Sequence, residues 1–355
     1  MSEKQTILIT GGAGFVGSWL VDKFISKNDV NVIIVDDLST GSTNNLPQVH
    51  NDRWTFIKCD INNYREISAV MLAFRFDYVF HYAAVVGVQR TLDNPSAVLK
   101  DIEGLKNILD LSKNTGVKRI FYSSSSEVYG EPVEMPQNEK TTPLNSRLPY
   151  AVVKNLGEVM LRTYQSEYGL NYTIFRLFNT YGPRQSPDFV ISKFISKALA
   201  GEDVTIYGDG NQTRTFCFIE DHILATFSAY EGNQFINDVV NIGNDVQINV
   251  VELAQTIIRQ TNSNSKIKYL PALPDGDMQR RQPDVTNMIG LMNRTFTPLE
   301  KGLEKTILSL PSPLNKVDAS RVLQQKQLKT TTPHQGLIGK WQSLSSHTRR
   351  RCVDS

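Results

Sequence analysis

Short apolar runs alternate with amphipathic stretches through the first 180 residues of the chain. Each run is rich in Val, Ile, Phe or Tyr and is too short for a helix, so it predicts a buried β-strand. The stretches between the runs repeat apolar residues at the spacing of an α-helix. The predicted strands are residues 7–10, 32–35, 55–57, 78–81, 119–123 and 172–177, and the clearest helices are 16–26 and 98–114.

Strands that alternate with helices form βαβ units, in which the strands lie parallel in one sheet. We therefore predict an α/β fold with a Rossmann-type, doubly wound parallel sheet over residues 1–180. Ligand sites in such sheets lie at the carboxyl ends of the strands. Polar residues that follow a predicted strand are therefore candidates for binding or catalysis.

The alternation of apolar runs and helical patterns becomes irregular after residue 180. Two further helices and two further strands are predicted, over 189–200, 250–261, 204–207 and 239–242. We interpret residues 181–310 as a smaller, mixed α/β substrate lobe on the C-terminal side, with the chain crossing between the two lobes. Residues 311–355 are mostly Ser, Thr, Gln, Lys and Pro, a composition that buries little surface and predicts a basic, disordered tail.

The charge of the chain is small overall but unevenly distributed. The net charge at pH 7 is +2, whereas residues 311–355 carry eight Lys and Arg against two Asp, which leaves residues 1–310 net negative. This balance does not indicate nucleic-acid or membrane binding. The cysteines, Cys59, Cys217 and Cys352, lack metal-ligand spacing, and no leader or membrane-spanning apolar run is found. We expect a cytoplasmic protein without a metal.

A glycine-rich turn follows the first predicted strand and precedes the first predicted helix. The sequence TGGAGFVG spaces Gly11, Gly14 and Gly17 as G-x-x-G-x-x-G. Glycines permit a tight turn, and the N–H groups at the start of a helix attract the pyrophosphate of a dinucleotide. The turn is therefore a candidate phosphate-binding site.

An acidic residue at the end of the next strand supports this interpretation. Asp36 lies nineteen residues after Gly17, where a carboxylate accepts hydrogen bonds from the adenosine ribose and repels a 2′-phosphate. Asp60 and Ile61, which follow the third strand, are candidates to flank the adenine. Together these positions predict NAD rather than NADP as the cofactor.

Tyr150 and Lys154 stand four residues apart, so a helix would place both on one face. An ammonium group beside a phenol stabilises the phenolate and lowers the pKa of the phenol. Such a phenolate takes a proton from a substrate hydroxyl as a hydride leaves for nicotinamide. The serine run 123–126 supports a catalytic interpretation of the pair, because it ends the fifth predicted strand and supplies hydroxyls that can bind the reacting oxygen.

The motifs together resemble those of the extended short-chain dehydrogenase/reductases that act on nucleotide-sugars, namely 4-epimerases, 4,6-dehydratases and UDP-glucuronate decarboxylases. The resemblance extends over about residues 5–308. It includes, in chain order, TGGAGFVGS, VDDLSTG, HYAA, SSSSEVYG, YAVVK, RLFNTYGPRQ, IYGDGNQTRTF, VNIGN and RRQPD. It implies an NAD-dependent enzyme that acts on a nucleotide-diphosphate sugar, and a homodimer formed through helices near 98–114 and 150–167.

The resemblance also implies roles for individual residues. Ser125 matches the family's active-site Ser or Thr, Tyr150 its base and Lys154 the partner of the base, and Glu127 is expected in the same catalytic centre. Besides the residues already named, the cofactor contacts implied are Phe15, Val16, Ala83 and Lys154. The substrate contacts implied are Ser126, Asn179, Val190, Tyr207, Arg214 and Arg281. The asparagine and both arginines match residues near the nucleotide diphosphate, for which guanidinium groups are suited.

The resembled reactions all begin with a 4-keto sugar and differ in the second step. Dehydratases carry Asp-Glu before V-Y-G, whereas this chain has Ser126-Glu127, so an expected general acid is missing. Decarboxylases carry Ser-Glu there and an arginine in R-x-P-D, which residues 281–284 reproduce. The apolar run 85–88 is closer to epimerases, which need no further acid or base, so Glu127 would only bind a sugar hydroxyl.

We therefore prefer epimerisation, with decarboxylation as the close alternative and dehydration less favoured. A protein that binds NAD without catalysis is a further alternative. Asp101 supports it, because the resembled pattern has Asn at this position and an ionised Asp cannot donate a hydrogen bond in its place.

Overall fold

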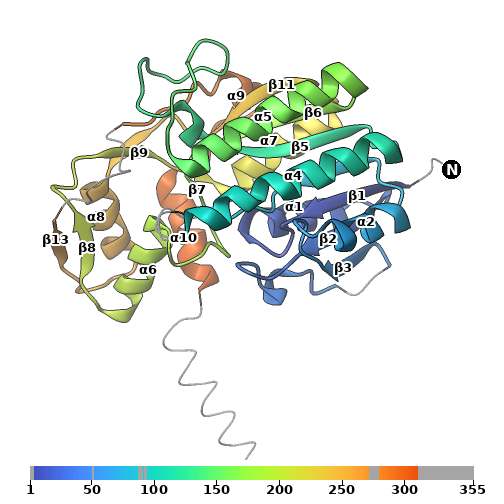
Figure 1. Ribbon diagram of the computed structural model, residues 1–355. Coiled ribbons are helices and arrows are strands. Elements are labelled where there is room, and N and C mark those ends of the chain that lie inside the picture. Colours follow the sequence, from blue (N-terminus) through green and yellow to red (C-terminus); the bar gives the residue numbers. More distant parts are fainter. Residues whose placement is uncertain (1–3, 50–51, 87–90, 92–93, 272–279, 311–355) are drawn as a thin grey trace, which may run out of the picture. The chain divides into compact units, whose positions relative to one another are not determined.

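Seven parallel strands form the central sheet of the protein (Figure 1). The computed structural model describes residues 4–49, 52–86, 91, 94–271 and 280–310. The strands are β1 (Gln5–Thr10), β2 (Val30–Asp36), β3 (Trp54–Lys58), β4 (Tyr78–His81), β5 (Arg119–Ser125), β6 (Asn171–Leu177) and β11 (Asp238–Ile242). Their order is β11-β6-β5-β4-β1-β2-β3, so the strand order reverses between β1 and β4.

Helices cover both faces of this sheet. Side chains alternate along each strand, and in β1 they divide between two cores, with Ile7 and Ile9 on one face and Leu8 on the other. On the Leu8 face lie α2 (Tyr64–Ala73), α4 (Pro95–Thr115) and α5 (Pro149–Tyr168). On the opposite face lie α1 (Phe15–Ile25), α7 (Ile219–Glu231) and α9 (Thr286–Met292). Covering both faces explains why these strands read as continuous apolar runs.

The predicted fold class is confirmed, since every predicted strand and helix lies within an observed one, apart from differences of one or two residues at the ends. The division of the chain at residue 180 stays a prediction. Residues 238–242 were assigned to the smaller lobe, 181–310, but they form β11, which pairs with β6 at the edge of the large sheet. The buried Val239, Val240 and Ile242 fit a strand that is covered by helices. The predicted tail, 311–355, lies outside the described residues.

The smaller lobe is built from short strand pairs and helices. The pairs are β8 (Val204–Tyr207) with β13 (Ile267–Leu270), β9 (Thr213–Thr215) with β12 (Gln247–Asn249), and β7 (Thr180–Tyr181) with β10 (Cys217–Phe218). The helices of this lobe are α6 (Val190–Ala200), α8 (Val250–Gln260) and α10 (Leu299–Ser309). Two 3-10 turns, η1 (Thr43–Asn45) and η2 (Ser126–Tyr129), complete the described elements. None of the helices in the described part of the chain is long and apolar enough to cross a membrane.

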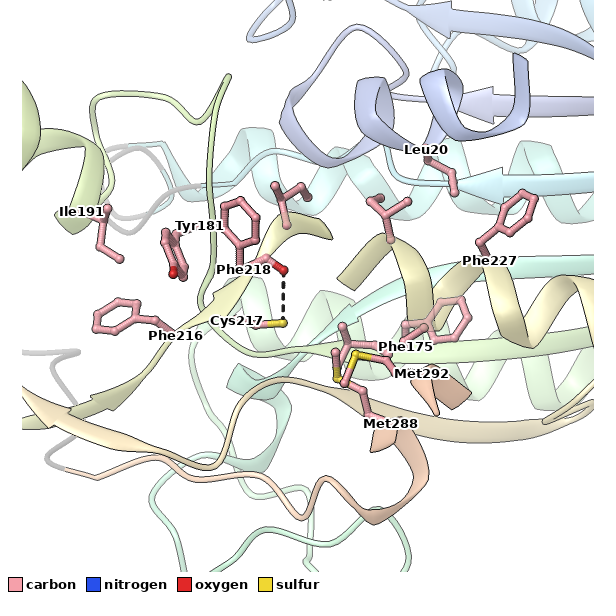
Figure 2. Packing of buried hydrophobic residues seen from close by; sticks show 14 of the residues in the cluster. Leu20, Phe175, Tyr181, Ile191, Phe216, Cys217, Phe218, Phe227, Met288 and Met292 are labelled. Carbon is pink, nitrogen blue, oxygen red and sulfur yellow. Dashed lines mark hydrogen bonds between the residues drawn. The ribbon is translucent and has the colours of Figure 1, made fainter. Parts of the chain in front are cut away.

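One continuous hydrophobic core connects the smaller lobe to the large sheet (Figure 2). Ile191 and Phe216 of the smaller lobe pack near Tyr181, and the cluster continues to Leu20 and Phe227 on the helices of the large lobe. All five side chains are nearly inaccessible to solvent. The two lobes are therefore held together by burial of apolar surface, which fixes the carboxyl ends of the strands relative to the smaller lobe.

A buried ion pair joins α5 to the sheet. Arg176 of β6 donates from Nε and Nη2 to the two carboxylate oxygens of Glu158, at 2.9 and 2.8 Å, and Ser124 donates to Glu158 Oε1 at 2.7 Å. Arg176 Nη1 also donates to the Tyr129 hydroxyl at 2.9 Å, which donates to Asn241 Oδ1 at 2.7 Å. The network satisfies charges that would be costly to bury alone.

Removing one partner of this pair should destabilise the fold. Glu158→Leu leaves the Arg176 guanidinium buried without its carboxylate, so the free energy of unfolding should fall by about 3–5 kcal/mol. The double variant Glu158→Leu/Arg176→Met removes both charges and should recover much of this loss. Urea titration of the three proteins measures the effect, and a single variant as stable as the wild type would contradict the account.

Candidate active site

The glycine-rich turn lies where the strand order reverses. Gly11 has φ +69°, its N–H donates to Val35 O at 2.8 Å, and a Cβ there would lie 2.6 Å from the backbone N of Ala83. A Cβ on Gly17 would overlap the carbonyl oxygen of Gly11. The turn therefore packs backbone against backbone at the ends of β1 and β4, the point where open α/β sheets bind ligands.

The residues around the turn fit a dinucleotide. Phe15 and Val16 begin α1, and its N-cap, Gly14, has no side chain to occupy the helix N–H groups. The Asp36 carboxylate accepts hydrogen bonds from the N–H groups of Ala13 at 3.0 Å and Leu38 at 2.9 Å. Burial raises the pKa of Asp36, and these hydrogen bonds oppose the rise. The carboxylate is thus fixed against the turn at the end of β2.

The two residues predicted beside the adenine lie in the neighbouring loop. Cys59 N donates to Asp36 O at 3.1 Å, which brings the end of β3 next to the end of β2. Asp60 Oδ1 accepts from Asn62 N at 2.9 Å, and Ile61 is buried against α4. The structure therefore gathers the predicted cofactor residues along one edge of the sheet, and their contacts with a cofactor stay a prediction.

Tyr150 and Lys154 lie on the first turns of α5, beside the end of β5. Lys154 is buried, its Nζ donates to Ser123 O at 2.8 Å, and it lies 5.8 Å from the centroid of the Tyr150 ring. Tyr150 is hydrogen-bonded to Ser125, whose Oγ also accepts from Glu127 N at 3.2 Å. The structure thus brings together all four residues predicted for catalysis.

The electrostatics of this group differ in part from the expectation. Burial lowers the pKa of Lys154 to about 8, and the charge of Asp101 opposes the fall. Burial raises the pKa of Tyr150, although its hydrogen bond with Ser125 lowers it. The expected lowering of the phenol pKa is therefore wrong for the protein alone, because the cost of burying a phenolate exceeds the favourable contributions.

Arg281 lies beside the residues predicted for catalysis and contacts Glu127, the residue whose expected role differs between the candidate reactions. Its Nη2 forms an ion pair with Glu127 Oε1 at 2.9 Å, and its Nη1 donates to Ser126 Oγ at 3.2 Å. Glu127 Oε2 is buried and has no hydrogen-bond partner among the described residues. The predicted contact of Arg281 with the diphosphate stays untested, whereas its contact with Ser126 and Glu127 was not foreseen.

The remaining predicted substrate residues lie in segments that follow β6 in the chain. Asn179 Nδ2 donates to Thr215 O at 3.2 Å, next to Arg214 on β9. Val190 begins α6, and Tyr207 ends β8 with 36% of its surface exposed and the Lys193 ammonium 5.7 Å from its ring centroid. In the described residues no group of His, Cys, Asp and Glu has an arrangement suited to a metal ion.

Sequence reasoning missed the contacts that hold the site. The carbonyl of Ser123 binds Lys154, and the sequence shows it only as the first residue of the serine run. Trp19 of α1 donates from Nε1 to Pro183 O at 3.0 Å, and Arg184 forms an ion pair with Asp22 at 2.7 Å. These contacts join the helix that follows the glycine turn to the loop before α6, and no periodicity or motif signals them.

Three comparisons place the chain among known proteins. Residues 7–243 match the model of the NAD dependent epimerase/dehydratase family. UDP-glucuronic acid decarboxylase 5 of Arabidopsis thaliana is 36% identical over 288 residues, which cover 79% of this chain and 81% of that protein. A UDP-glucose 4-epimerase of Thermotoga maritima, solved with UDP-glucose, has a TM-score of 0.81 and 33% identity, over 88% of this chain and 99% of that one.

A structure with a bound dinucleotide is also similar. A double mutant of the dTDP-glucose 4,6-dehydratase DesIV from Streptomyces venezuelae, solved with NAD and DAU bound, has a TM-score of 0.80 and 26% identity. The similarity covers 87% of this chain and 98% of that one. The relatives are therefore named for three different reactions, so they support one family and leave the second step of the reaction open.

Filling the glycine turn should weaken cofactor binding. Gly17→Ala places a methyl group on the Gly11 carbonyl, so the turn must open and NAD should bind about tenfold more weakly or worse, as measured by isothermal titration calorimetry. Gly290→Ala on α9 is the matched control, since a Cβ there meets nothing within 4 Å. Equal dissociation constants for Gly17→Ala and the wild type would refute this role of the turn.

Proposed function

Because the chain belongs to the NAD-dependent epimerase/dehydratase family, we propose that it oxidises a nucleotide-diphosphate sugar at C4 and then decarboxylates it. The substrate would be a nucleotide-linked uronic acid. The observation that carries this proposal is the contact of Arg281 with both Ser126 and Glu127 beside Tyr150. Similarity to a UDP-glucuronic acid decarboxylase over most of the chain supports it.

The first step uses the residues at the end of β5. The glycine-rich turn and Asp36 would hold NAD, which would supply the acceptor for the hydride of C4 and the donor for its return. The Tyr150 oxygen accepts the proton of the C4 hydroxyl, and Ser125, already hydrogen-bonded to Tyr150, donates to the reacting oxygen. Since burial opposes the phenolate, nearby positive charge is needed to stabilise it: the charge of Arg281 lowers the pKa of Tyr150, and the ammonium of Lys154 lies 5.8 Å from the centroid of the ring.

The second step uses the Glu127–Arg281 pair. A keto group at C4 makes the uronic acid a β-keto acid, so the C5–C6 bond can break, releasing CO₂ and leaving its electron pair as an enolate at O4. Glu127 repels the substrate carboxylate, and Arg281, the cation beside it, is already held in an ion pair with Glu127. Protonation at C5 and return of the hydride to C4 then give a nucleotide-linked pentose.

Epimerisation at C4 is the second candidate, and it is the one that sequence analysis prefers. The similar structure of a UDP-glucose 4-epimerase and the apolar residues Val85 and Val86 favour it. The rest of the apolar run, Gly87 and Val88, lies outside the described residues. In an epimerase the Glu127–Arg281 pair would only bind sugar hydroxyls. That role does not need a carboxylate oxygen that, like Glu127 Oε2, is buried and has no hydrogen-bond partner among the described residues.

Product analysis should separate the two reactions. With UDP-glucuronate we expect stoichiometric CO₂ and a UDP-pentose, detected by trapping of labelled CO₂ and by NMR. Tyr150→Phe should lower kcat by about 10²–10⁴-fold, because the base is lost. A C4 epimer of UDP-glucose or UDP-N-acetylglucosamine, without CO₂ from UDP-glucuronate, would contradict decarboxylation and support epimerisation. Bound NAD with no turnover of any nucleotide-sugar would contradict both.

Glu127 should matter for the loss of CO₂ more than for oxidation. Glu127→Gln removes the repelling charge, so CO₂ release should slow by at least about tenfold while the absorbance of reduced cofactor at 340 nm accumulates on mixing with UDP-glucuronate. Glu131→Gln, at an exposed position four residues away, is the control and should behave as the wild type. Equal slowing of both steps would contradict the proposed role.

We also propose that the chain forms the homodimer expected from its family resemblance, through α4 and α5. Val152, Leu156 and Val159 form an apolar stripe along α5, each at least 39% exposed, and Leu99 of α4 is 52% exposed. The two helices lie side by side (Figure 1). A contiguous apolar surface of this kind is typical of a protein–protein interface.

Charges on this stripe should break the dimer. Val152→Glu/Val159→Glu should elute as a monomer in size-exclusion chromatography with light scattering, whereas the wild type should elute as a dimer. Leu72→Glu, at a 72% exposed apolar position on α2, is the matched control and should stay dimeric. An unchanged mass for the double variant would exclude this surface as the interface.

A further inference from the structure

Asp101 is an acidic residue of the catalytic lobe that the proposed reaction does not use. It lies on α4, is partly buried, and its Oδ2 accepts a hydrogen bond from Val85 N at 2.8 Å. Val85 follows β4 and therefore belongs to the loop beside the cofactor-binding edge of the sheet. Among the described residues Asp101 thus accepts one hydrogen bond, and the proposed reaction gives its negative charge no role.

Asp101 lines a small cavity beside the residues predicted for catalysis. Asp101 lines this cavity from α4 and Lys154 lines it from α5, while His81 and Tyr122 line it from β4 and β5. The other lining residues are uncharged: Ala83, Ala84, Ile102, Leu105, Val153, Gly157 and Met160. The cavity therefore lies between one acid and the catalytic ammonium.

The other titratable groups that line the cavity are neutral, so its charges are those of Asp101 and Lys154. Burial and the charge of Lys154 lower the pKa of His81 to about 3, and its Nδ1 is hydrogen-bonded to Thr10 Oγ1 at 3.1 Å, so the ring is neutral at pH 7. Burial raises the pKa of Tyr122 well above its usual value, so this phenol is neutral too. Beyond the cavity, Asp101 interacts with the more distant charges of Asp37 and Asp60.

We infer that Asp101 is the counter-ion of Lys154, a positioning residue that keeps the ammonium charged and sets the pH range in which the site works. The inference rests on the proposed roles of Tyr150 and Lys154. Lys154 is buried, and among the described residues its ammonium donates one hydrogen bond, to the neutral carbonyl of Ser123, so the hydrogen bond alone does not compensate its charge. A carboxylate in the adjoining cavity stabilises the charged form.

The direction of the effect follows from the two groups that Asp101 influences. Its charge raises the pKa of Lys154 against the effect of burial, so removing that charge lowers the pKa of Lys154 below about 8. The same charge raises the pKa of Tyr150, so its removal lowers that pKa as well. Lys154 is charged below its pKa, and the phenolate of Tyr150 forms above the pKa of the phenol. Because both pKa values fall when the charge of Asp101 is removed, the acidic and the basic limb of the pH–activity profile both move to lower pH.

The variant Asp101→Asn separates charge from structure. Asparagine keeps the shape and an oxygen that accepts from Val85 N, but it carries no charge. If Asp101 served only to hold the Val85 loop, Asp101→Asn would keep the pH profile of the wild type and Asp101→Leu would lose activity at every pH. Glu103→Gln removes a charge from an exposed position of the same helix and is the matched control.

The test combines kinetics with a direct titration of the lysine. In protein labelled with ¹³C-lysine, the Cε signal of Lys154, assigned with Lys154→Arg, should titrate near pH 8, apart from exposed lysines at about 10.4. In Asp101→Asn this titration and both limbs of the kcat/KM profile should move to lower pH, and in Glu103→Gln neither should move.

An unchanged Lys154 titration in folded Asp101→Asn would overturn the inference, as would a loss of activity without movement of either limb. The NMR titration needs neither cofactor nor substrate. Full activity of Tyr150→Phe would therefore refute the proposed function and leave the titration as an independent result on Asp101 and Lys154.

Discussion

The candidate active site depends on one buried ammonium group. Lys154 donates from α5 to the carbonyl of Ser123, near the carboxyl end of β5, and it is almost inaccessible to solvent. Burial disfavours the charged lysine and also disfavours the phenolate of Tyr150. The site therefore brings together two groups whose charged forms are each disfavoured by burial and depend on other charges nearby, Arg281 for Tyr150 and Asp101 for Lys154.

A network of hydrogen bonds connects the part of the site that lies on α5 with the segment that carries Arg281. Glu158, one turn after Lys154 on α5, binds Arg176, and the network continues through Tyr129 to Asn241. Asn241 Nδ2 donates to Gln137 O at 2.9 Å, and Gln137 pairs with the segment that follows Arg281. The position of the Glu127–Arg281 pair relative to the lysine thus follows from a continuous chain of hydrogen bonds, in which distant segments of the sequence meet.

Periodicity was sufficient to predict most of the fold, because strands covered on both faces read as apolar runs and amphipathic helices repeat every three or four residues. The position of residues 238–242 was not predicted, since a buried strand has the same pattern in either lobe. Tyr150, Lys154 and the serine run followed from helix spacing and a strand end, whereas the roles of Ser125 and Glu127 followed from the family resemblance and stay predictions. The contact of Arg281 with Glu127 and the direction of the Tyr150 pKa did not follow, because both depend on side chains far apart in sequence and on burial.

The central claim is that Tyr150 and Lys154 support transient oxidation of the sugar at C4. The hydrogen removed from C4 is then returned to C4 within the same active site. The fate of deuterium in a nucleotide-sugar labelled at C4 tests it most directly, with the product isolated from ordinary water and analysed by NMR and mass spectrometry. The account predicts that the product keeps the deuterium at C4 and that turnover is slower than with the unlabelled sugar. Formation of product in which this deuterium has been replaced by solvent hydrogen would contradict it.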